Sequence, residues 1–281
     1  MKTSNLCYFN GDLIPYPELQ IHVSDLQMQR GYGVFDFFRA RNGQIPWLED
    51  YTDRLFNSMK LAEIDPIRGT LRDTSTLMTK DAFTSIIHDL HGENREENGA
   101  FKVIVTGGFS DTLATVTGSP NFMILNVPWT RPPAESYKRG VQLISHEYVR
   151  PDPLIKTLNY FNTVRLRKKF REFNAVDVLY HDDHIREASR ANLFLVKDNT
   201  IYTPASGILE GITRKQVLSI LPDVRVEDIE MKAFHDFDEM FMASTSRDIT
   251  PIVGVEGVKI GDGRPGKISR QVMEAFRERG W

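Results

Sequence analysis

Two residues in the second half of the chain have side chains suited to carbonyl chemistry. Lys156 follows the proline-rich loop RPDPL and precedes a segment with helical periodicity. A partly desolvated lysine amine attacks aldehydes to form a Schiff base and can afterwards transfer a proton. Glu187, in IREASRANLFLV, is flanked by apolar residues, and a buried carboxylate there would keep a pyridinium nitrogen protonated. The simpler alternatives are a lysine that extends to solvent and a glutamate on the outer face of a hairpin.

Three further segments have groups that bind phosphate. GITR at 211–214 begins a predicted helix and STS at 244–246 follows a predicted strand, so both offer backbone N–H groups and hydroxyls. Arg54, within another predicted helix, can make a bidentate contact with phosphate. Ordinary capped helices, turns and exposed helix charges have the same features, so both interpretations stay open.

Other polar clusters fit solvent-exposed surfaces. The turn 181–184 holds two histidines and two aspartates, but adjacent positions on a turn seldom converge, so we expect no metal site. The basic run 165–171 has no interleaved aromatic residue besides Phe170, which fits an exposed helix face. GYG at 31–33 lacks the third glycine of a dinucleotide-binding loop.

Length, charge and cysteine content limit the class of protein. The chain has 281 residues and a net charge of −3, which gives no electrostatic reason for a nucleic acid or membrane partner. It has a single cysteine, Cys7, no apolar stretch that could span a bilayer and no signal-peptide segment. We therefore expect a cytoplasmic protein that acts on a small polar molecule.

Periodicity and turn residues predict two domains of mixed structure. Asn-Gly pairs at 10–11 and 42–43 predict two hairpins and an antiparallel sheet, followed by a helix over 48–64 that carries Arg54. Residues 155–173 predict an amphipathic helix beside Lys156. Consecutive prolines at 132–133 indicate a connection, so we expect domains at 1–126 and 136–281 joined by residues 127–135.

The order of the motifs is more specific than any one of them. Six segments follow one another: VSDLQMQRGYGVFDFFRARNG, YTDRLFNS, IKTLNYFNTVR, IREASRANLFLV, GILEGITRKQVL and ASTSRDITPI. In this order, from about residue 8 to the end, the chain resembles the class IV, fold type IV pyridoxal-phosphate aminotransferases. That family includes branched-chain aminotransferases, D-amino-acid aminotransferases and aminodeoxychorismate lyases. The resemblance implies an α+β fold, with a small α/β N-terminal domain, a larger C-terminal domain with a β-barrel-like core, and a site at the domain interface.

The resemblance also implies pyridoxal 5'-phosphate as the cofactor and roles for individual residues. Lys156 matches the catalytic lysine that bonds to the cofactor, and Glu187 matches the contact to the pyridine nitrogen. Arg54 matches the phosphate-binding arginine of an HxxRL motif, and Tyr160 a tyrosine near the phenolic oxygen. The other phosphate contacts match Ile212, Thr213, Ser244 and Thr245. Asn192 and Leu193 belong to the Glu187 motif and receive no chemical role.

Four residues depart from the family's motifs and bear on the substrate. Tyr51 replaces the histidine of HxxRL, RGDGVFE reads RGYGVFD with Tyr32 and Asp36, and the arginine of a TRG strand motif is Gly107. The remaining candidates for binding a substrate carboxylate are Arg30, Tyr32, Lys102, Arg186 and Arg190. In the family the segment of Arg30 and Tyr32 reaches the site from the adjoining subunit, which implies a homodimer with its active site at the subunit interface.

The preferred hypothesis is a transaminase that uses D-amino acids or other simple amino acids as donors and 2-oxoglutarate as the acceptor. The alternatives are a branched-chain L-amino-acid aminotransferase, an aminodeoxychorismate lyase, which eliminates pyruvate with the same lysine, and a non-catalytic protein that binds the cofactor. KTLN at 156–159 is compatible with the lyase, whereas Tyr160 favours transamination. Retention of both Lys156 and Glu187 argues against a protein that only binds.

Overall fold

The computed structural model describes residues 5–65, 78–95, 97–116, 120–221 and 223–279. The chain divides into two compact units: unit 1 is Met1–Thr130 with Ile155–Asn159, and unit 2 is Arg131–Leu154 with Tyr160–Trp281. The boundary after Thr130 falls inside the expected connection 127–135. The segment Ile155–Asn159 differs from the expectation, because it packs with unit 1 although its position in the sequence had assigned it to the second domain.

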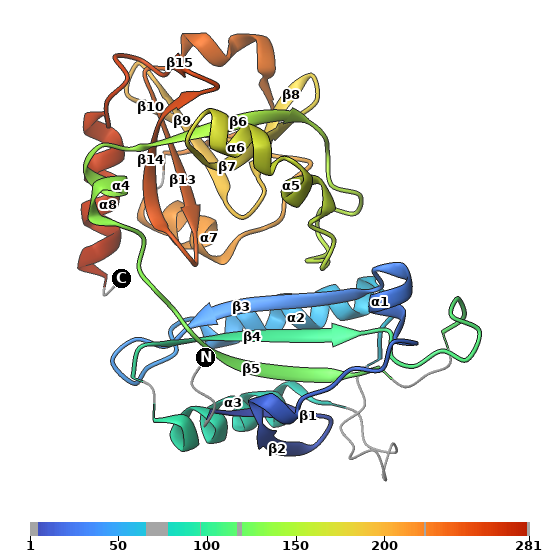
Figure 1. Cartoon of the computed structure of the whole chain (residues 1–281). Coiled ribbons are helices and arrows are strands. Elements are labelled where there is room, and N and C mark those ends of the chain that lie inside the picture. The colour runs from blue at the N-terminus through green and yellow to red at the C-terminus, as the bar shows by residue number, and fades with distance from the viewer. Residues whose placement is uncertain (1–4, 66–77, 96, 117–119, 222, 280–281) are drawn as a thin grey trace. The chain divides into compact units, whose positions relative to one another are not determined.

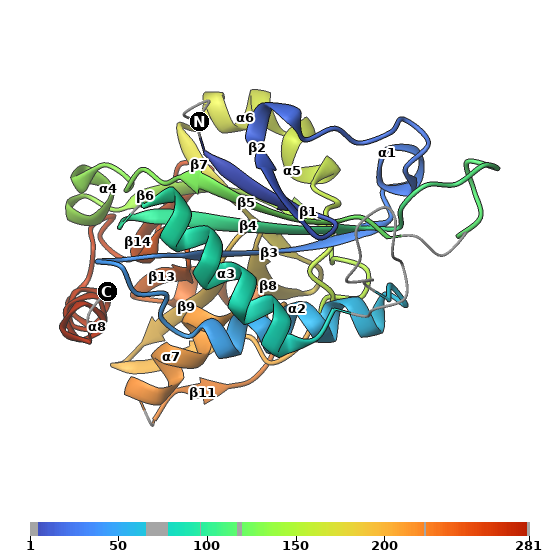
Figure 2. The ribbon, with the colours of Figure 1, turned by 90° about the horizontal axis from the view of Figure 1, so that it is seen from below.

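Unit 1 is an antiparallel sheet with two helices on one face. In its described residues five strands pair in the order β2-β1-β5-β4-β3, and every pairing is antiparallel. Helix α2 packs on β3 and helix α3 on β1 and β5, and the two helices contact each other across the same face (Figure 2). The elements are β1 (Leu6–Phe9), β2 (Asp12–Pro15), a 3-10 helix (Tyr16–Glu18), α1 (Leu26–Arg30), β3 (Gly33–Arg39), α2 (Leu48–Leu61), α3 (Lys80–Asn94), β4 (Gly99–Thr106) and β5 (Phe122–Pro128).

Both predicted Asn-Gly turns form, but only the first is followed by a second strand. Asn10 and Gly11 both have positive φ and join β1 to β2, as an Asn-Gly turn requires. Asn42 and Gly43 also have positive φ, and a bridge between Arg41 and Gln44 closes their turn. The hairpin stops there, and β3 pairs with β4 along its whole length. The second hairpin cannot extend because helix α2 begins at Leu48, a few residues after the turn.

Helix α2 forms as its apolar spacing predicts. Leu48, Tyr51, Leu55 and Met59 are all buried, and they recur three or four residues apart. This face packs on β3, Ser58 is completely buried next to it, and the Arg54 side chain is 12% exposed.

Unit 2 contains a strongly curled sheet. Among its described residues ten strands pair in the order β11-β10-β9-β13-β14-β6-β7-β8-β12, with β15 on β14. Strand β8, near one end of this order, returns to contact β9, near the other, so the sheet curls into the expected barrel-like core. The interior is apolar and includes Leu143, Leu179, Leu193, Met242 and Ile252.

Helices cover the outside of this sheet. Helices α4, α7 and α8 pack on β13 or β14, and α6 packs on β6 and β7 (Figure 1). The elements are α4 (Ala134–Lys138), β6 (Val141–Glu147), α5 (Phe161–Arg165), α6 (Arg167–Glu172), β7 (Ala175–His181), β8 (His184–Ala188), β9 (Asn192–Lys197), β10 (Thr200–Thr203), α7 (Ile212–Ile220), β11 (Arg225–Val226), β12 (Ile229–Glu230), a 3-10 helix (Met231–Asp236), β13 (Glu239–Ser244), β14 (Asp248–Val255), β15 (Val258–Lys259) and α8 (Lys267–Glu278). Every helix within the described ranges is too short or too polar to cross a bilayer.

The amphipathic helix predicted over 155–173 is wrong at its N-terminal end. The helical part begins only at Phe161 and is split into α5 and α6. The preceding residues run in an extended conformation along β3, with a bridge between Val34 and Thr157 and a hydrogen bond from Leu158 N–H to the Gly33 carbonyl (3.1 Å). Because β3 is the last strand of its sheet, its outer edge has unpaired backbone groups that this segment satisfies.

Candidate active site

Lys156 is held against strand β3 and helix α2 in unit 1. Its carbonyl accepts a hydrogen bond from Phe35 N–H (2.9 Å), and its own N–H donates to Ser58 Oγ (3.1 Å). The ammonium lies 4.7 Å from the centre of the Phe35 ring, and the Lys102 ammonium lies 5.6 Å from the same ring. Both distances are within the range of cation–π attraction. Two amines are therefore gathered at one aromatic side chain, which limits the solvation of each.

Arg54 forms a buried ion pair that sequence reasoning did not predict. Its Nε and Nη2 donate to the two carboxylate oxygens of Asp36, at 2.9 and 2.6 Å, and the Asp36 side chain is completely buried. The Arg54 guanidinium also lies 5.4 Å from the Tyr51 ring centre. A bidentate contact fixes the plane of a guanidinium. Two of the departures from the family's motifs, Asp36 and Tyr51, are thus direct contacts of Arg54.

Ser58 places the Lys156 segment beside Arg54. Residues four apart on a helix lie on the same face, and Arg54 and Ser58 are four apart on α2. Ser58 is completely buried and accepts the Lys156 N–H. Unit 1 therefore brings the predicted catalytic lysine and the predicted phosphate-binding arginine to one face of one helix.

In unit 2, Glu187 on β8 is buried and both its oxygens accept hydrogen bonds. Arg150 Nε donates to Oε1 at 2.6 Å, and the Leu209 N–H donates to Oε2 at 3.0 Å. The side chain is 6% exposed, so water cannot replace these partners. An adjacent guanidinium favours the ionised carboxylate. Glu187 is consequently a fixed anion, as a partner for a protonated ring nitrogen must be.

The Tyr160 hydroxyl is held in its neutral form. Burial, opposed by Arg150 and reinforced by the charges of Asp177 and Glu187, raises the pKa of Tyr160 to about 12. At neutral pH the hydroxyl is therefore protonated and can donate a hydrogen bond. This protonation state is compatible with its predicted place near a phenolic oxygen.

The predicted phosphate contacts lie at the start of α7 and the end of β13. Gly211 is the N-cap of α7 and makes no side-chain cap bond, and Ile212 and Thr213 in the first turn are buried. Helix α7 packs on β13, which ends at Ser244, and Thr245 follows directly. Among the described side chains, Ser244 Oγ is a buried oxygen with no hydrogen-bond partner. An orphaned buried hydroxyl and an uncapped helix N-terminus fit the phosphate of the expected cofactor.

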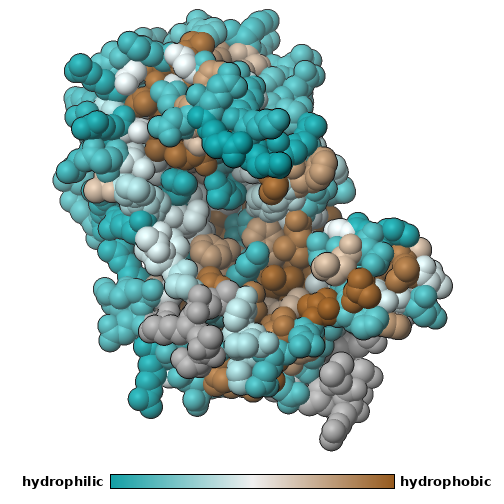
Figure 3. Space-filling view, viewed as in Figure 1, coloured by the Kyte–Doolittle hydropathy of each residue, from teal (hydrophilic) through white to brown (hydrophobic). Residues whose placement is uncertain are grey.

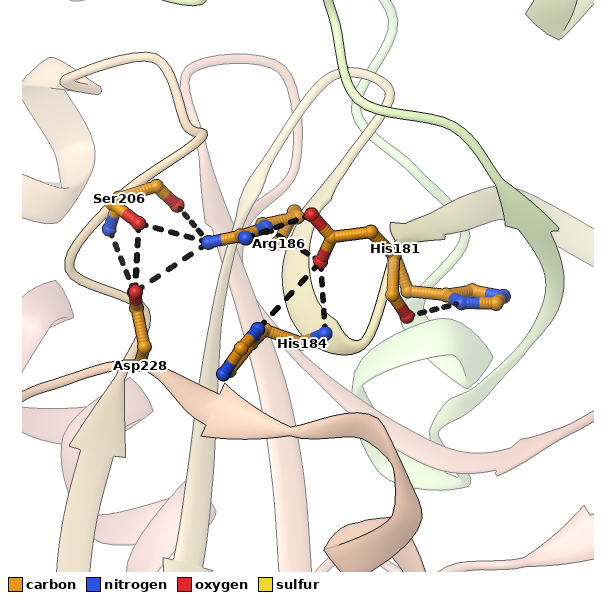
Figure 4. A network of polar contacts seen from close by, with 6 residues as sticks. His181, His184, Arg186, Ser206 and Asp228 are labelled. Carbon is orange, nitrogen blue, oxygen red and sulfur yellow. Dashed lines mark hydrogen bonds and ion pairs between the residues drawn. The ribbon is translucent and has the colours of Figure 1, made fainter.

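Figure 4 shows that Arg186, a predicted substrate contact, is engaged within its own unit. Its Nε and Nη2 bind the Asp182 carboxylate at 3.0 and 2.8 Å, and Nη1 binds Ser206 Oγ at 2.8 Å and lies 3.5 Å from Asp228. These contacts join the turn after β7 to the loop before α7. His184 begins β8 directly after this turn, and its N–H donates to the Asp182 carboxylate. In the described ranges no group of three or more His, Cys, Asp or Glu side chains could hold a metal ion.

The other predicted substrate contacts have different surroundings. Arg190 donates to the Asp177 carboxylate (3.3 Å) and is half exposed. Arg30, at the end of α1, is exposed and donates to the neighbouring Gln29 carbonyl (3.1 Å). Lys102 lies near Lys156 within unit 1, through the Phe35 ring they share.

The Tyr32 side chain packs over Gly107 in unit 1. Its hydroxyl donates to the Ala62 carbonyl at the end of α2 (2.6 Å), and a Cβ atom at position 107 would lie 2.3 Å from the Tyr32 ring. Tyr32 and Gly107, two separate departures from the family's motifs, therefore pack against each other. While Tyr32 is in this position, no side chain fits at 107.

Sequence reasoning missed Arg150, Ser58 and the structural role of Asn192. Arg150 is 37 residues from its partner Glu187 and lies in a proline-rich loop that gives no periodic signal. Ser58 carried a usable signal, its spacing of four from Arg54. Asn192 stood in the Glu187 motif, but its amide donates to the Leu209 carbonyl (2.8 Å), which no local pattern indicates.

Comparison with known proteins identifies relatives along the whole chain. Over 284 residues, 96% of both chains, it is 25% identical to the D-alanine aminotransferase of Staphylococcus haemolyticus. The solved structure of a branched-chain amino acid aminotransferase from Escherichia coli is 22% identical, with a TM-score of 0.86 and coverage of 98% of this chain and 94% of that one. The structure of a putative 4-amino-4-deoxychorismate lyase from Legionella pneumophila is 22% identical, with a TM-score of 0.80 and coverage of 94% and 96%.

These likenesses confirm the expected fold type IV architecture. The family described as amino-transferase class IV matches residues 33–255 of the chain, which include both units and the segment that carries Lys156. This protein belongs to the class IV aminotransferase family.

Proposed function

We propose that this aminotransferase moves the amino group of a D-amino acid to a 2-keto acid such as 2-oxoglutarate, with pyridoxal 5'-phosphate as its cofactor. The observation that carries the proposal is the buried Glu187 carboxylate, whose oxygens accept hydrogen bonds from Arg150 and the Leu209 N–H. A protein that only stored the cofactor would need a phosphate site but no buried anion for the ring. The likeness to a D-alanine aminotransferase along 96% of the chain supports the choice of donor.

Different residues would hold the reacting aldehyde and the phosphate of the cofactor. When bound, pyridoxal phosphate supplies an aldehyde that takes up the amino group and a ring that withdraws electrons from the α-carbon. Lys156 would provide the amine that bonds to the aldehyde. Arg54, Ile212, Thr213, Ser244 and Thr245 would bind the phosphate.

Three side chains then control protons during the reaction. Lys156 Nζ, free once the substrate amine has taken its place, would be the base that accepts the α-proton. Glu187 would keep a ring nitrogen protonated, and the neutral Tyr160 hydroxyl would be able to donate to a phenolic oxygen. The donor would leave as a 2-keto acid, and a second keto acid would then accept the amino group that the cofactor holds between the two half-reactions, so we expect ping-pong kinetics.

Lys102 is our choice for the substrate carboxylate. Its ammonium and that of Lys156 lie at the same Phe35 ring, whereas Arg186 and Arg190 bind acidic groups of their own unit. A cation near the reacting amine orients the carboxylate and thereby decides which enantiomer presents its α-hydrogen to Lys156.

We also propose a homodimer in which Arg30 and Tyr32 approach the site of the adjoining subunit. The surface around α1 is apolar for an exposed region: Val23, Met28 and Phe109 are 64%, 66% and 48% exposed. Residues 24–26 hydrogen-bond to residues 108–110, so these side chains belong to one surface. Figure 3 shows apolar residues over the part of unit 1 that carries α1. Exposed apolar patches of this kind mark protein interfaces.

The single cysteine fits the reducing cytoplasm as the compartment.

Single-substrate half-reactions test the function. Purified protein loaded with pyridoxal phosphate is mixed with one amino acid at a time, and the visible absorbance of the bound aldehyde is followed. Loss of that band with D-alanine or D-glutamate, and its return with 2-oxoglutarate, would support the proposal. Loss with L-leucine instead would identify a branched-chain enzyme, and pyruvate release from aminodeoxychorismate would identify a lyase. Loaded protein that responds to none of these would be a binding protein.

A further inference from the structure

Two side chains of one hairpin hold both backbone groups of Leu209. Glu187 Oε2 accepts the Leu209 N–H at 3.0 Å, and Asn192 Nδ2 donates to the Leu209 carbonyl at 2.8 Å. Both side chains are about 5% exposed, so water does not compete for these bonds. The peptide groups before and after Leu209 are thus each held by one side chain.

A tight turn explains why these two side chains reach the same residue. Residues 189–191 link β8 to β9, and an isolated bridge pairs Ala188 with Ala191. Glu187 and Asn192 directly flank this bridge, and both side chains contact Leu209.

The amide of Asn192 also fixes the start of helix α7. An ideal Cβ atom at Gly211 would lie 2.0 Å from Asn192 Oδ1, so the amide packs directly on the Gly211 backbone. Gly211 is the N-cap of α7, and its φ of −71° is open to other residues. Close approach of Asn192, and not backbone strain, requires glycine here.

We propose that Asn192 is a positioning residue that fixes the distance between Glu187 and the N-terminus of α7. The inference rests on the proposed function, in which Glu187 binds the ring nitrogen and the first turn of α7 binds the phosphate. The ring nitrogen and the phosphate belong to one small molecule whose bonds limit the distance between them, so a fixed spacing of the two protein contacts lets both form together. Asn192 sets that spacing through Leu209 and Gly211 and touches neither end.

The test compares pyridoxal phosphate with pyridoxal, which lacks the phosphate. In Asn192→Asp the side chain keeps its shape but its carboxylate cannot donate to the Leu209 carbonyl. We expect the Kd for pyridoxal phosphate to rise about tenfold, the effect of losing one buried hydrogen bond, and the Kd for pyridoxal to change less than about twofold. Deuterium exchange of the cofactor-free protein should be faster at residues 208–213.

Asn126→Ala is the matched control. Asn126 is a strand residue with 2% exposure, and within the described part of the chain its amide has no hydrogen-bond partner. Its replacement should leave the ratio of the two Kd values unchanged.

Gly211→Ala gives a second route that does not alter Asn192. The added methyl group displaces the amide from Leu209, so this variant should show the same loss of phosphate-dependent affinity. Combining it with Asn192→Ala removes the clash, and the loss in the pair should be smaller than the sum of the single losses.

The outcomes separate the inference from the proposed function. Wild-type protein that binds neither ligand would overturn the function. A different result would overturn the role of Asn192. In that case the wild-type protein binds pyridoxal phosphate, and both Asn192→Asp and Gly211→Ala keep the wild-type ratio of the Kd for pyridoxal phosphate to the Kd for pyridoxal.

Discussion

Replacing Arg54 separates its ion pair with Asp36 from its proposed role as a phosphate ligand. In Arg54→Met the cofactor-free protein keeps Asp36, whose carboxylate is completely buried and loses both of its charged hydrogen bonds. Breaking a buried ion pair by removing one partner costs about 3–5 kcal/mol, because the remaining charge is uncompensated. The double variant Arg54→Met with Asp36→Val removes the charge as well, and such apolar replacements are often neutral. We therefore expect the double variant to recover most of the stability that the single variant loses.

Urea unfolding of the cofactor-free proteins measures the stability, and absorbance titration with pyridoxal phosphate measures the binding. Both variants should bind the cofactor weakly, because neither offers a guanidinium to the phosphate. The control is Lys80→Met, which breaks the pair between Lys80 and Asp53 of α2. Both of these side chains are 54% exposed, so the loss should be under about 1 kcal/mol.

Two results would refute this reasoning. If Arg54→Met loses no more stability than Lys80→Met, the pair with Asp36 contributes as little as a surface pair. If the double variant regains cofactor affinity together with stability, Arg54 supports the fold and does not bind phosphate.

Three further changes have defined outcomes. Arg150→Leu leaves the buried Glu187 with only the Leu209 N–H, so urea unfolding should show a loss of about 2–5 kcal/mol, and a loss near zero would contradict an ionised Glu187. Gly107→Ala drives a methyl group into the Tyr32 ring and should cost about 1–3 kcal/mol in the same assay, whereas Tyr32→Ala should tolerate it. Burial tends to raise the pKa of Glu256, but hydrogen bonds from Lys169 and Ser145 outweigh it and lower that pKa below the unfolded value. Its stabilisation is therefore complete above the unfolded pKa and is lost as the pH falls through the folded one, so Glu256→Gln should flatten the loss of stability in urea between neutral pH and about pH 3.

Local signals predicted most of the elements, and their failures share one cause. The Asn-Gly hairpin after β1, the helix α2 and the hairpin β7–β8 form from residues adjacent in sequence. The second hairpin and the helix at 155–160 fail because β3 pairs with two distant partners, β4 on one edge and residues 156–158 on the other. A sequence pattern shows that a strand is apolar, but not which distant segment of the chain will occupy its edge.

In the candidate site, too, local motifs predicted some residues, whereas contacts between distant segments determine others. Lys156, Glu187 and Arg54 were identified through their motifs, since each motif names a residue that would touch the cofactor. Arg150 and Asn192, which hold Glu187 and Leu209, act through contacts between distant segments. A residue that only positions another residue belongs to no recognisable chemical motif, so it can be identified only from a structure that shows what it contacts.

The departures from the family's motifs are understood best as compensated pairs. Asp36 and Tyr51 both contact Arg54, and Tyr32 fills the space above Gly107. A side chain at 107 and the Tyr32 ring exclude each other, so an arginine in the strand motif could return only if residue 32 changed as well. The four substitutions therefore form two local groups: Asp36 and Tyr51 fix the plane of the Arg54 guanidinium, and Tyr32 occupies the space that a side chain at position 107 would need. Because Tyr32 leaves no room for an arginine at position 107, another cation must bind the substrate carboxylate. The Lys102 ammonium lies at the same aromatic ring as that of Lys156. Of the candidate residues, Lys102 is therefore the one whose replacement should change the choice of amino acid most.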